Sequence, residues 1–157
     1  MAEIIEGMDA VLKKMQQLDA MHQRRALRRG VTRGATEVRK KARANAKSLD
    51  NSATEEQIFR NISAKAWRVR KNRPYLGSSI GVLGGAKSPA TAVGEIKGKG
   101  KDNPGGDTWY WRMLEFGTKK MEAKPFLSTA LESEKNKAVA AIRDGASKAI
   151  DDILAKS

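Results

Sequence analysis

The sequence of 157 residues contains no cysteine and a single histidine, His22. Without thiolates, a disulfide framework and every zinc site built from cysteine are excluded, and one imidazole has no second one with which to share a metal. No apolar run approaches the roughly 20 residues that cross a bilayer, and the first residues lack the basic and then apolar order of a signal peptide. We therefore expect one domain over residues 1–157 that is made and used in the cytosol, with no membrane partner.

Acidic residues are also scarce relative to basic ones. Thirty-one Lys and Arg stand against 18 Asp and Glu, which gives a formal charge of +13. A polyanion such as nucleic acid is therefore a plausible neighbour, although charge alone carries no sequence specificity.

Two helices are predicted near the start of the chain. Residues 8–18 carry apolar side chains three or four apart, and Gly7 precedes them. Residues 22–47 predict a longer helix, because apolar residues return to one side at about 100° per residue. That predicted apolar face consists of Leu27, Val31, Ala35, Val38, Ala42 and Ala46.

The opposite side of the longer helix is basic. It carries Arg25, Arg29, Arg33, Arg39, Lys40, Arg43 and Lys47. A solvated helix face explains such a run as well as a contact does. If it is a contact, the partner is either a neighbouring subunit or DNA, and phosphates would be met without reading bases.

The middle of the chain predicts a small sheet. Residues 49–54 form a linker in which Asp50, Ser52 or Thr54 could cap a short helix that ends at Phe59. Alternating residues beyond position 62 predict two or three short antiparallel strands, with a further strand at residues 93–96. The glycine- and lysine-rich segment 84–107 is expected to be a flexible loop.

The last third predicts two helices. Residues 109–116 form a compact apolar helix, capped by Asp107 or Thr108 and ended by Gly117. Pro125 suits the first position of a long terminal helix, in which Gly145 marks a point for a kink or a break. The order predicts an α+β fold: a small antiparallel sheet with a long hairpin, packed against an N-terminal amphipathic helix and a long C-terminal helix.

The sequence from Trp109 to Thr118, followed by Ala123-Lys124-Pro125-Phe126-Leu127, resembles the signature of head-to-tail joining and tail-completion proteins of long-tailed bacteriophages and prophages, a family similar to lambda protein Z. The motif residues are Trp109, Tyr110, Glu115, Phe116, Gly117, Thr118, Pro125 and Phe126. The chain departs from the family in its linker and in a longer loop.

The resemblance implies a structural virion protein with no enzymatic activity and no cofactor. It implies a homo-oligomeric ring, sixfold like a tail tube, that completes the tail and joins it to the head. Its partners would be the head-closure, tail-terminator and tail-tube proteins, in the virion neck or tail and in the host cytoplasm during assembly. The basic face adds non-specific contact with phage DNA as a further option.

Elementary physical chemistry gives the motif residues roles in folding. Phe116 and Phe126 are expected to anchor the two sides of a turn in the core. Glu115 lies beside aromatic residues, so its carboxylate is expected to need a basic partner within the subunit or across a ring interface. For such an interface, the acidic side is predicted on the last helix, at Glu132, Glu134, Asp144, Asp151 and Asp152.

The sequence gives less support to more specific functions, such as nucleotide binding or catalysis. Residues 81–88 nearly match a phosphate-binding loop, but Ala86 replaces the second glycine and Pro89 follows where a helix should open. His22 and the neighbouring carboxylates at positions 55–56 and 151–152 suggest surface residues, because adjacent helical residues point about 100° apart. The alternative function is a sequence-independent DNA-binding protein of nucleoid type, disfavoured by the lack of stacking aromatics and of groove-reading motifs.

Overall fold

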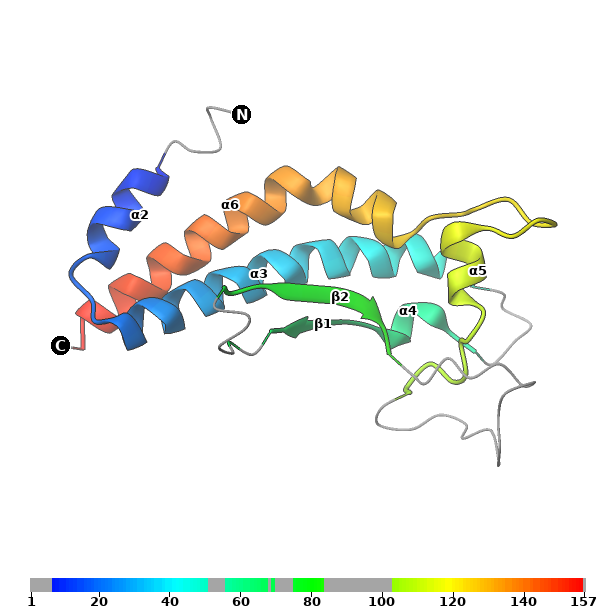
Figure 1. The fold of residues 1–157 in the computed structure, drawn as a ribbon, viewed down its shortest axis with the longest axis horizontal. Helices are drawn as coiled ribbons and strands as arrows, with labels where there is room; N and C mark the ends of the chain where they lie inside the picture. Colours follow the sequence, from blue (N-terminus) through cyan, green and yellow to red (C-terminus); the bar gives the residue numbers. More distant parts are fainter. Residues whose placement is uncertain (1–6, 51–55, 68, 70–74, 84–102, 157) are drawn as a thin grey trace. The chain divides into compact units, whose positions relative to one another are not determined.

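The computed structural model describes residues 7–50, 56–67, 69, 75–83 and 103–156. Its elements, in chain order, are α2 (Met8–Met15), α3 (Ala20–Lys47), α4 (Ile58–Asn61), β1 (Ile62–Ala66), β2 (Ser78–Val82), α5 (Trp111–Phe116) and α6 (Leu127–Leu154), as Figure 1 shows. Strands β1 and β2 form a two-stranded antiparallel sheet. The predicted α+β class is confirmed.

The chain divides into two compact units. The first comprises residues 1–38, 64–79 and 134–157, and the second comprises residues 39–63 and 80–133. Helices α3 and α6 each contribute one end to each unit. That the whole chain acts as a single domain stays a prediction.

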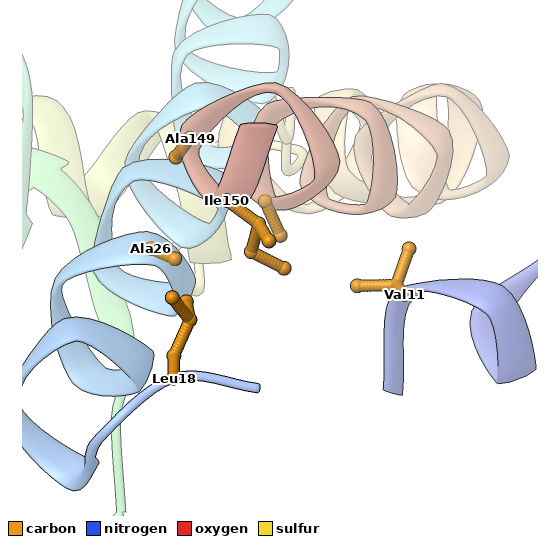
Figure 2. Close-up of a cluster of buried hydrophobic side chains, with 6 residues drawn as sticks. Val11, Leu18, Ala26, Ala149 and Ile150 are labelled. Atoms are coloured by element: carbon orange, nitrogen blue, oxygen red, sulfur yellow. The ribbon is translucent and has the colours of Figure 1, made fainter. Parts of the chain in front are cut away.

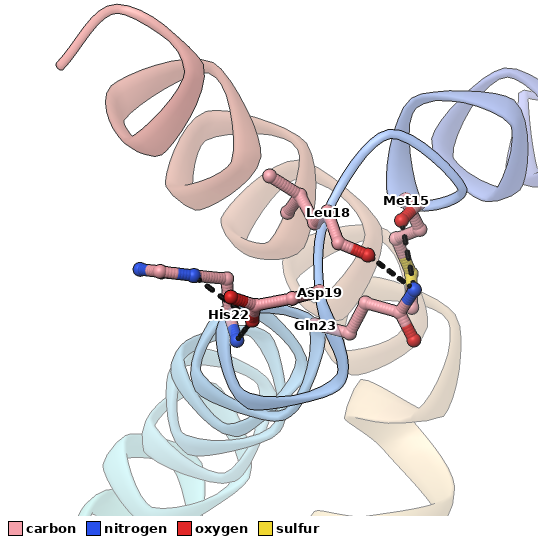
Figure 3. A network of polar contacts seen from close by, with 5 residues as sticks. All are labelled: Met15, Leu18, Asp19, His22 and Gln23. Carbon is pink, nitrogen blue, oxygen red and sulfur yellow. Dashed lines mark hydrogen bonds and ion pairs between the residues drawn. The ribbon is translucent and has the colours of Figure 1, made fainter. Parts of the chain in front are cut away.

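In the first unit, the turn between α2 and α3 is fixed by side chains. Asp19 caps α3, because its Oδ1 accepts the backbone N–H of His22 at 2.8 Å and lies 2.9 Å from the His22 ring (Figure 3). The bond from the His22 amide, with that from the ring, lowers the pKa of Asp19. Gln23 Nε2 donates to the carbonyls of Met15 and Leu18. Helix α2 ends at Met15, three residues earlier than predicted. His22 is therefore the third residue of α3, in the first turn that Asp19 caps.

The core of the first unit joins α2, α3 and α6. Figure 2 shows the cluster, in which Val11 and Leu18 meet the side chains of α3 and α6. Its buried members are Val11, Leu18, Ala26, Ala146, Ala149 and Ile150. Three of the six are alanines, so the two long helices approach closely here.

The buried side of α3 begins with small residues. Ala26, Gly30 and Gly34 are buried, whereas Leu27 and Val31 are only half-buried. The predicted apolar face was therefore wrong by one position in this half and right further on, where Ala35, Val38, Ala42 and Ala46 are buried. The error has a physical cause, since glycines carry no hydrophobic signal but allow two backbones to touch.

Helix α6 runs antiparallel to α3 against these glycines. A Cβ on Gly30 would lie 2.5 Å from the carbonyl oxygen of Ile142, and one on Gly34 would lie 2.7 Å from that of Ala138. From the other side, a Cβ on Gly145 would lie 3.1 Å from Gly30 Cα. Helix α6 is continuous from Leu127 to Leu154, so it has no break at Gly145. Gly145 is a packing position.

In the second unit, distant side chains complete the short elements. Asp50 caps α4, because its two carboxylate oxygens accept the N–H groups of Ile58 at 3.0 Å and Phe59 at 3.4 Å. This decides which residue of the linker caps the helix, while Ser52 and Thr54 lie outside the described residues. The strand expected at residues 93–96 also lies outside them, as does most of the loop expected at 84–107.

A buried amide holds residues 103–108 against α4. Asn61 is fully buried, its Nδ2 donates to Gly106 O at 2.8 Å and to Thr108 Oγ1 at 2.9 Å, and its Oδ1 accepts Gly105 N–H at 2.7 Å. Asn103 Oδ1 is a further acceptor, at 2.9 Å. A Cβ on Gly105 would collide with the backbone oxygen of Gln57, so only glycine fits there. This network fixes the chain immediately before α5.

Candidate interaction surfaces

Helix α5 is shorter than the sequence predicted. It spans Trp111–Phe116, and its N-cap residue Tyr110 makes no side-chain cap. The predicted cap by Asp107 or Thr108 is wrong: Asp107 Oδ1 accepts Asn103 Nδ2 at 2.9 Å, and the Thr108 hydroxyl accepts Asn61 Nδ2. Burial raises the pKa of Tyr110 to about 12, with further contributions from the charges of Glu56 and Asp50.

Glu115 joins α5 to the start of α6. Its Oε2 accepts hydrogen bonds from the backbone N–H groups of Phe126, at 2.8 Å, and of Leu127, at 2.9 Å. Its Oε1 accepts hydrogen bonds from the backbone N–H of Ser128, at 2.9 Å, and from the Ser128 hydroxyl. The carboxylate thus caps the helix and faces the positive end of its dipole. Burial alone would raise the pKa of Glu115, but these bonds outweigh it and lower the pKa. We call this arrangement the Glu115 clasp.

The clasp replaces the basic partner expected for Glu115. A helix N-terminus satisfies a buried carboxylate with amide donors alone, and sequence periodicity does not report such contacts between segments. Pro125 lies two residues before α6 and is exposed, and its carbonyl accepts the Thr129 hydroxyl at 2.7 Å. The predicted first helical position was therefore close but wrong.

After α5 the chain folds back on itself. Gly117 ends the helix with a φ of 72°, as the sequence predicted. Thr118 bonds to Met121 across a tight turn, and Lys124 N–H donates to Leu114 O at 2.7 Å. A Cβ on Gly117 would lie 3.0 Å from Met121 O, so the backbones at these two positions touch. Residues 118–125 are all exposed.

The two motif phenylalanines have opposite environments. Phe126 is 1% exposed and lies in the core as predicted, but Phe116 is 72% exposed, so its predicted core role is wrong. A helix of six residues has room to bury one narrow side only, and here Glu115 takes the buried position. Trp109 and Trp111 are half-buried.

Two methionines accompany Phe116. Met113 lies one helical turn before it and is 41% exposed, and Met121 in the adjoining turn is 38% exposed. We call Met113, Phe116 and Met121 the apolar patch. Sequence reasoning missed both methionines, although the three-residue spacing of Met113 and Phe116 was a usable signal.

The predicted basic face does not form one exposed surface. Arg25, Arg29, Arg33, Lys40 and Lys47 are exposed, whereas Arg39 and Arg43 are half-buried. Arg43 donates through Nε and Nη2 to Ile62 O at 3.0 and 2.8 Å, and burial lowers its pKa. The buried stripe on α3 turns by about 40° with every four residues, so it approaches the arginine side toward the end of the helix.

Most acidic candidates on α6 have cationic neighbours within the chain. Asp151 pairs with Lys14 at 2.8 Å and Asp152 with Arg29 at 3.9 Å. Glu134 lies 3.1 Å from Lys137 and Asp144 lies 3.0 Å from Arg143, while Glu132 is exposed. Apart from the Glu134 side chain, which is 14% exposed, the members of these pairs are exposed by about a third or more, so the pairs are weak. They nevertheless reduce the acidic surface that α6 offers to a neighbour.

The described ranges contain no group of three or more His, Asp or Glu residues that could hold a metal ion. Within the same ranges, no helix has the length and apolarity to cross a membrane. Of the near match to a phosphate-binding loop, Gly81 and Val82 belong to β2, and residues 84–88 lie outside the described part.

Comparison with known proteins identifies one family. Its model, described as "Bacteriophage HK97-gp10, putative tail-component", matches residues 9–117, from α2 through Gly117. Searches of curated proteins and of solved structures find no match. The matched range contains the apolar patch residues Met113 and Phe116 and the whole of α3, and it covers more than half of the chain. This chain therefore belongs to the HK97-gp10-like family of phage tail components.

Proposed function

We propose that the chain is a subunit of a homo-oligomeric ring, sixfold in symmetry, that completes the phage tail and joins it to the head. Its partners are the head-closure, tail-terminator and tail-tube proteins, and assembly takes place in the host cytoplasm. Membership of a tail-component family supports a structural role in the virion without enzymatic activity. The sixfold symmetry and the joining role come from the resemblance of the Trp109 to Leu127 sequence to lambda protein Z-like proteins.

The single observation that carries the self-association is the exposure of Phe116. Full burial of a phenylalanine is worth about 1.5–3 kcal/mol, and this one is 72% exposed on a helix that the Glu115 clasp holds in place. Aromatic side chains held rigidly in the open are frequent anchors of interfaces. Met113, one helical turn before Phe116, extends this side of α5, and Met121 in the adjoining turn is a further exposed and adaptable apolar side chain.

A ring requires two different surfaces on each subunit. The apolar patch supplies one of them, flanked by the exposed Lys119 and Lys120. The second would be an apolar surface with acidic neighbours, and the acidic residues of α6 contribute less than expected because four of the five are paired internally.

A Phe116→Ser variant tests the proposal. Phe116 makes little contact within the chain, so the variant should unfold at the temperature of the wild type but no longer form the wild-type oligomer in sedimentation. The matched control is Met21→Ser, which removes another exposed apolar side chain, 69% exposed on α3, and should leave the oligomer intact. A wild type that stays monomeric at every concentration, or an F116S variant that assembles normally, would contradict the proposal.

The alternative function, a nucleoid-type DNA-binding protein, predicts affinity for DNA and does not require the apolar patch. A variant that lost the oligomer and kept full function in the assembly of infectious particles would favour that alternative. Loss of particles with tails joined to heads supports the ring.

A further inference from the structure

Four arginines line an open groove on the first half of α3. Arg25, Arg28, Arg29 and Arg33 are all exposed, and Thr32 and Thr36 complete the lining. The positions recur three or four residues apart, so the guanidinium groups lie along one side of the helix. All six residues belong to the first unit, whereas Arg39 and Arg43 belong to the second and do not line the groove.

The positive charge of this groove is weakly compensated. The sequence contains no acidic residue from Ala20 to Thr36. Asp152 lies 3.9 Å from Arg29, and both side chains are about half exposed, so this ion pair is worth little in water. The groove therefore offers several cations to a partner that carries regularly spaced anions.

The lining favours phosphate contacts over contacts to bases. Thr32 donates its hydroxyl to Arg28 O at 2.8 Å, and Thr36 donates its own to Thr32 O at 2.9 Å, so both hydroxyl protons stay within the helix. None of the residues lining the groove is aromatic or carries an amide side chain. Single-stranded nucleic acid relies on stacking aromatics, and base edges are read chiefly by bidentate or amide contacts in a groove.

The dimensions fit a duplex backbone. Arg25 and Arg33 are eight residues apart, which corresponds to about 12 Å along a helix. Duplex DNA carries one negative charge per roughly 1.7 Å of its axis, so several phosphates lie within that length. We propose that the groove formed by Arg25, Arg28, Arg29 and Arg33 binds the phosphate backbone of double-stranded DNA without sequence preference. This goes beyond the ring, because it assigns the protein a second class of partner.

The test compares two variants that remove the same charge. R25Q/R28Q/R33Q spares Arg29 and hence its pair with Asp152, and the control K13Q/K135Q/K148Q removes three exposed lysines outside the groove. Fluorescence anisotropy with two unrelated duplexes of equal length, across a series of salt concentrations, gives the affinity and its salt slope. Light scattering records the oligomer of each protein.

The wild type should bind both duplexes equally, with log affinity falling by roughly 3.6 per tenfold salt for four phosphate contacts. The arginine variant should lose about 2.7 of that slope, for three contacts at about 0.9 each, and the lysine control should keep it. Absent binding, equal slopes in the two variants, or tighter binding of single strands would overturn the proposal. If the arginine variant loses both DNA binding and the oligomer, the arginines belong to subunit contacts and the DNA proposal is overturned as well. If the wild type is a monomer that binds duplexes as expected, the DNA proposal is upheld and only the ring is refuted.

Discussion

Removal of the Glu115 carboxylate should destabilise the protein, although its bonds within the described residues come from amide groups and one hydroxyl and not from a charged side chain. In a Glu115→Ala variant, the buried N–H of Phe126 and the part-buried N–H groups of Leu127 and Ser128 lose their acceptor. An unsatisfied buried donor costs about 1–3 kcal/mol and a part-buried one less, since water can reach it. We expect the free energy of unfolding to fall by about 2–4 kcal/mol, which also includes the loss of a helix cap.

Urea denaturation measures this change. The matched control is Glu122→Ala, which removes a carboxylate from the exposed turn after α5 and should shift stability by no more than about 0.5 kcal/mol. An E115A variant within that range of the wild type would refute the clasp. Equal losses in both variants would indicate a general effect of charge.

The same clasp predicts a pH dependence. The bonds from Ser128, Leu127 and Phe126 hold the pKa of Glu115 below 4.5, its ordinary value. Because the folded pKa is depressed, the unfolded chain binds the proton more readily, and the stabilisation is complete above the unfolded pKa. It is then lost as the pH falls through the folded pKa. A Glu115→Gln variant should lack this acidic loss, and an unchanged slope of stability against pH would argue against the clasp.

Three further perturbations test the packing and the polar network. Gly34→Ala should destabilise the protein by about 1–3 kcal/mol through overpacking, although helix propensity alone predicts a gain of about 1 kcal/mol. Thermal unfolding shows whether stability falls or rises, with Gly81→Ala as the control, because a Cβ added there meets nothing within 4 Å. A G34A variant more stable than the wild type would contradict the close contact. Asn61→Leu should lower the free energy of unfolding by roughly 2–4 kcal/mol, because Gly105 N–H is left without an acceptor and Gly106 O without a donor. A loss below about 0.5 kcal/mol in urea denaturation would show that the network is replaceable. The raised pKa of Tyr110, about 12, means that its contribution to stability is present below the unfolded pKa and is lost as pH rises through the folded value. In a Tyr75→Phe background, in which Tyr110 is the one remaining tyrosine, absorbance titration should show a phenolate step near pH 12, and a step near 10 would contradict the burial of Tyr110.

The sequence predicted the helices well because periodicity records which side of a long helix is buried. It placed α2, α3 and α6 and the small sheet, and it identified Gly117 as a helix end. It erred where burial depends on small residues, as at Gly30 and Gly34, because a glycine against a backbone leaves no hydrophobic pattern. It also placed Phe116 in the core, since residue type alone does not reveal which side of a six-residue helix faces solvent.

The polar contacts were the least predictable part. Asn61 and Glu115 each bond to segments that lie far along the chain or beyond a turn, and no spacing rule links them to those partners. The Asp50 cap was within reach, since it was one of three candidates, and the structure decides among them. The basic face was predicted as one surface, but the turning of the buried stripe along α3 separates an exposed arginine groove from the half-buried Arg39 and Arg43.

The central claim is that this tail component forms a ring at the junction of head and tail. Electron cryomicroscopy of assembled phage particles tests it most directly. We expect a closed sixfold ring at the upper end of the tail, with density that fits α3 and α6 and with Phe116 buried against the neighbouring subunit. Particles without this chain at the junction, or a ring in which Phe116 faces solvent, would contradict the account.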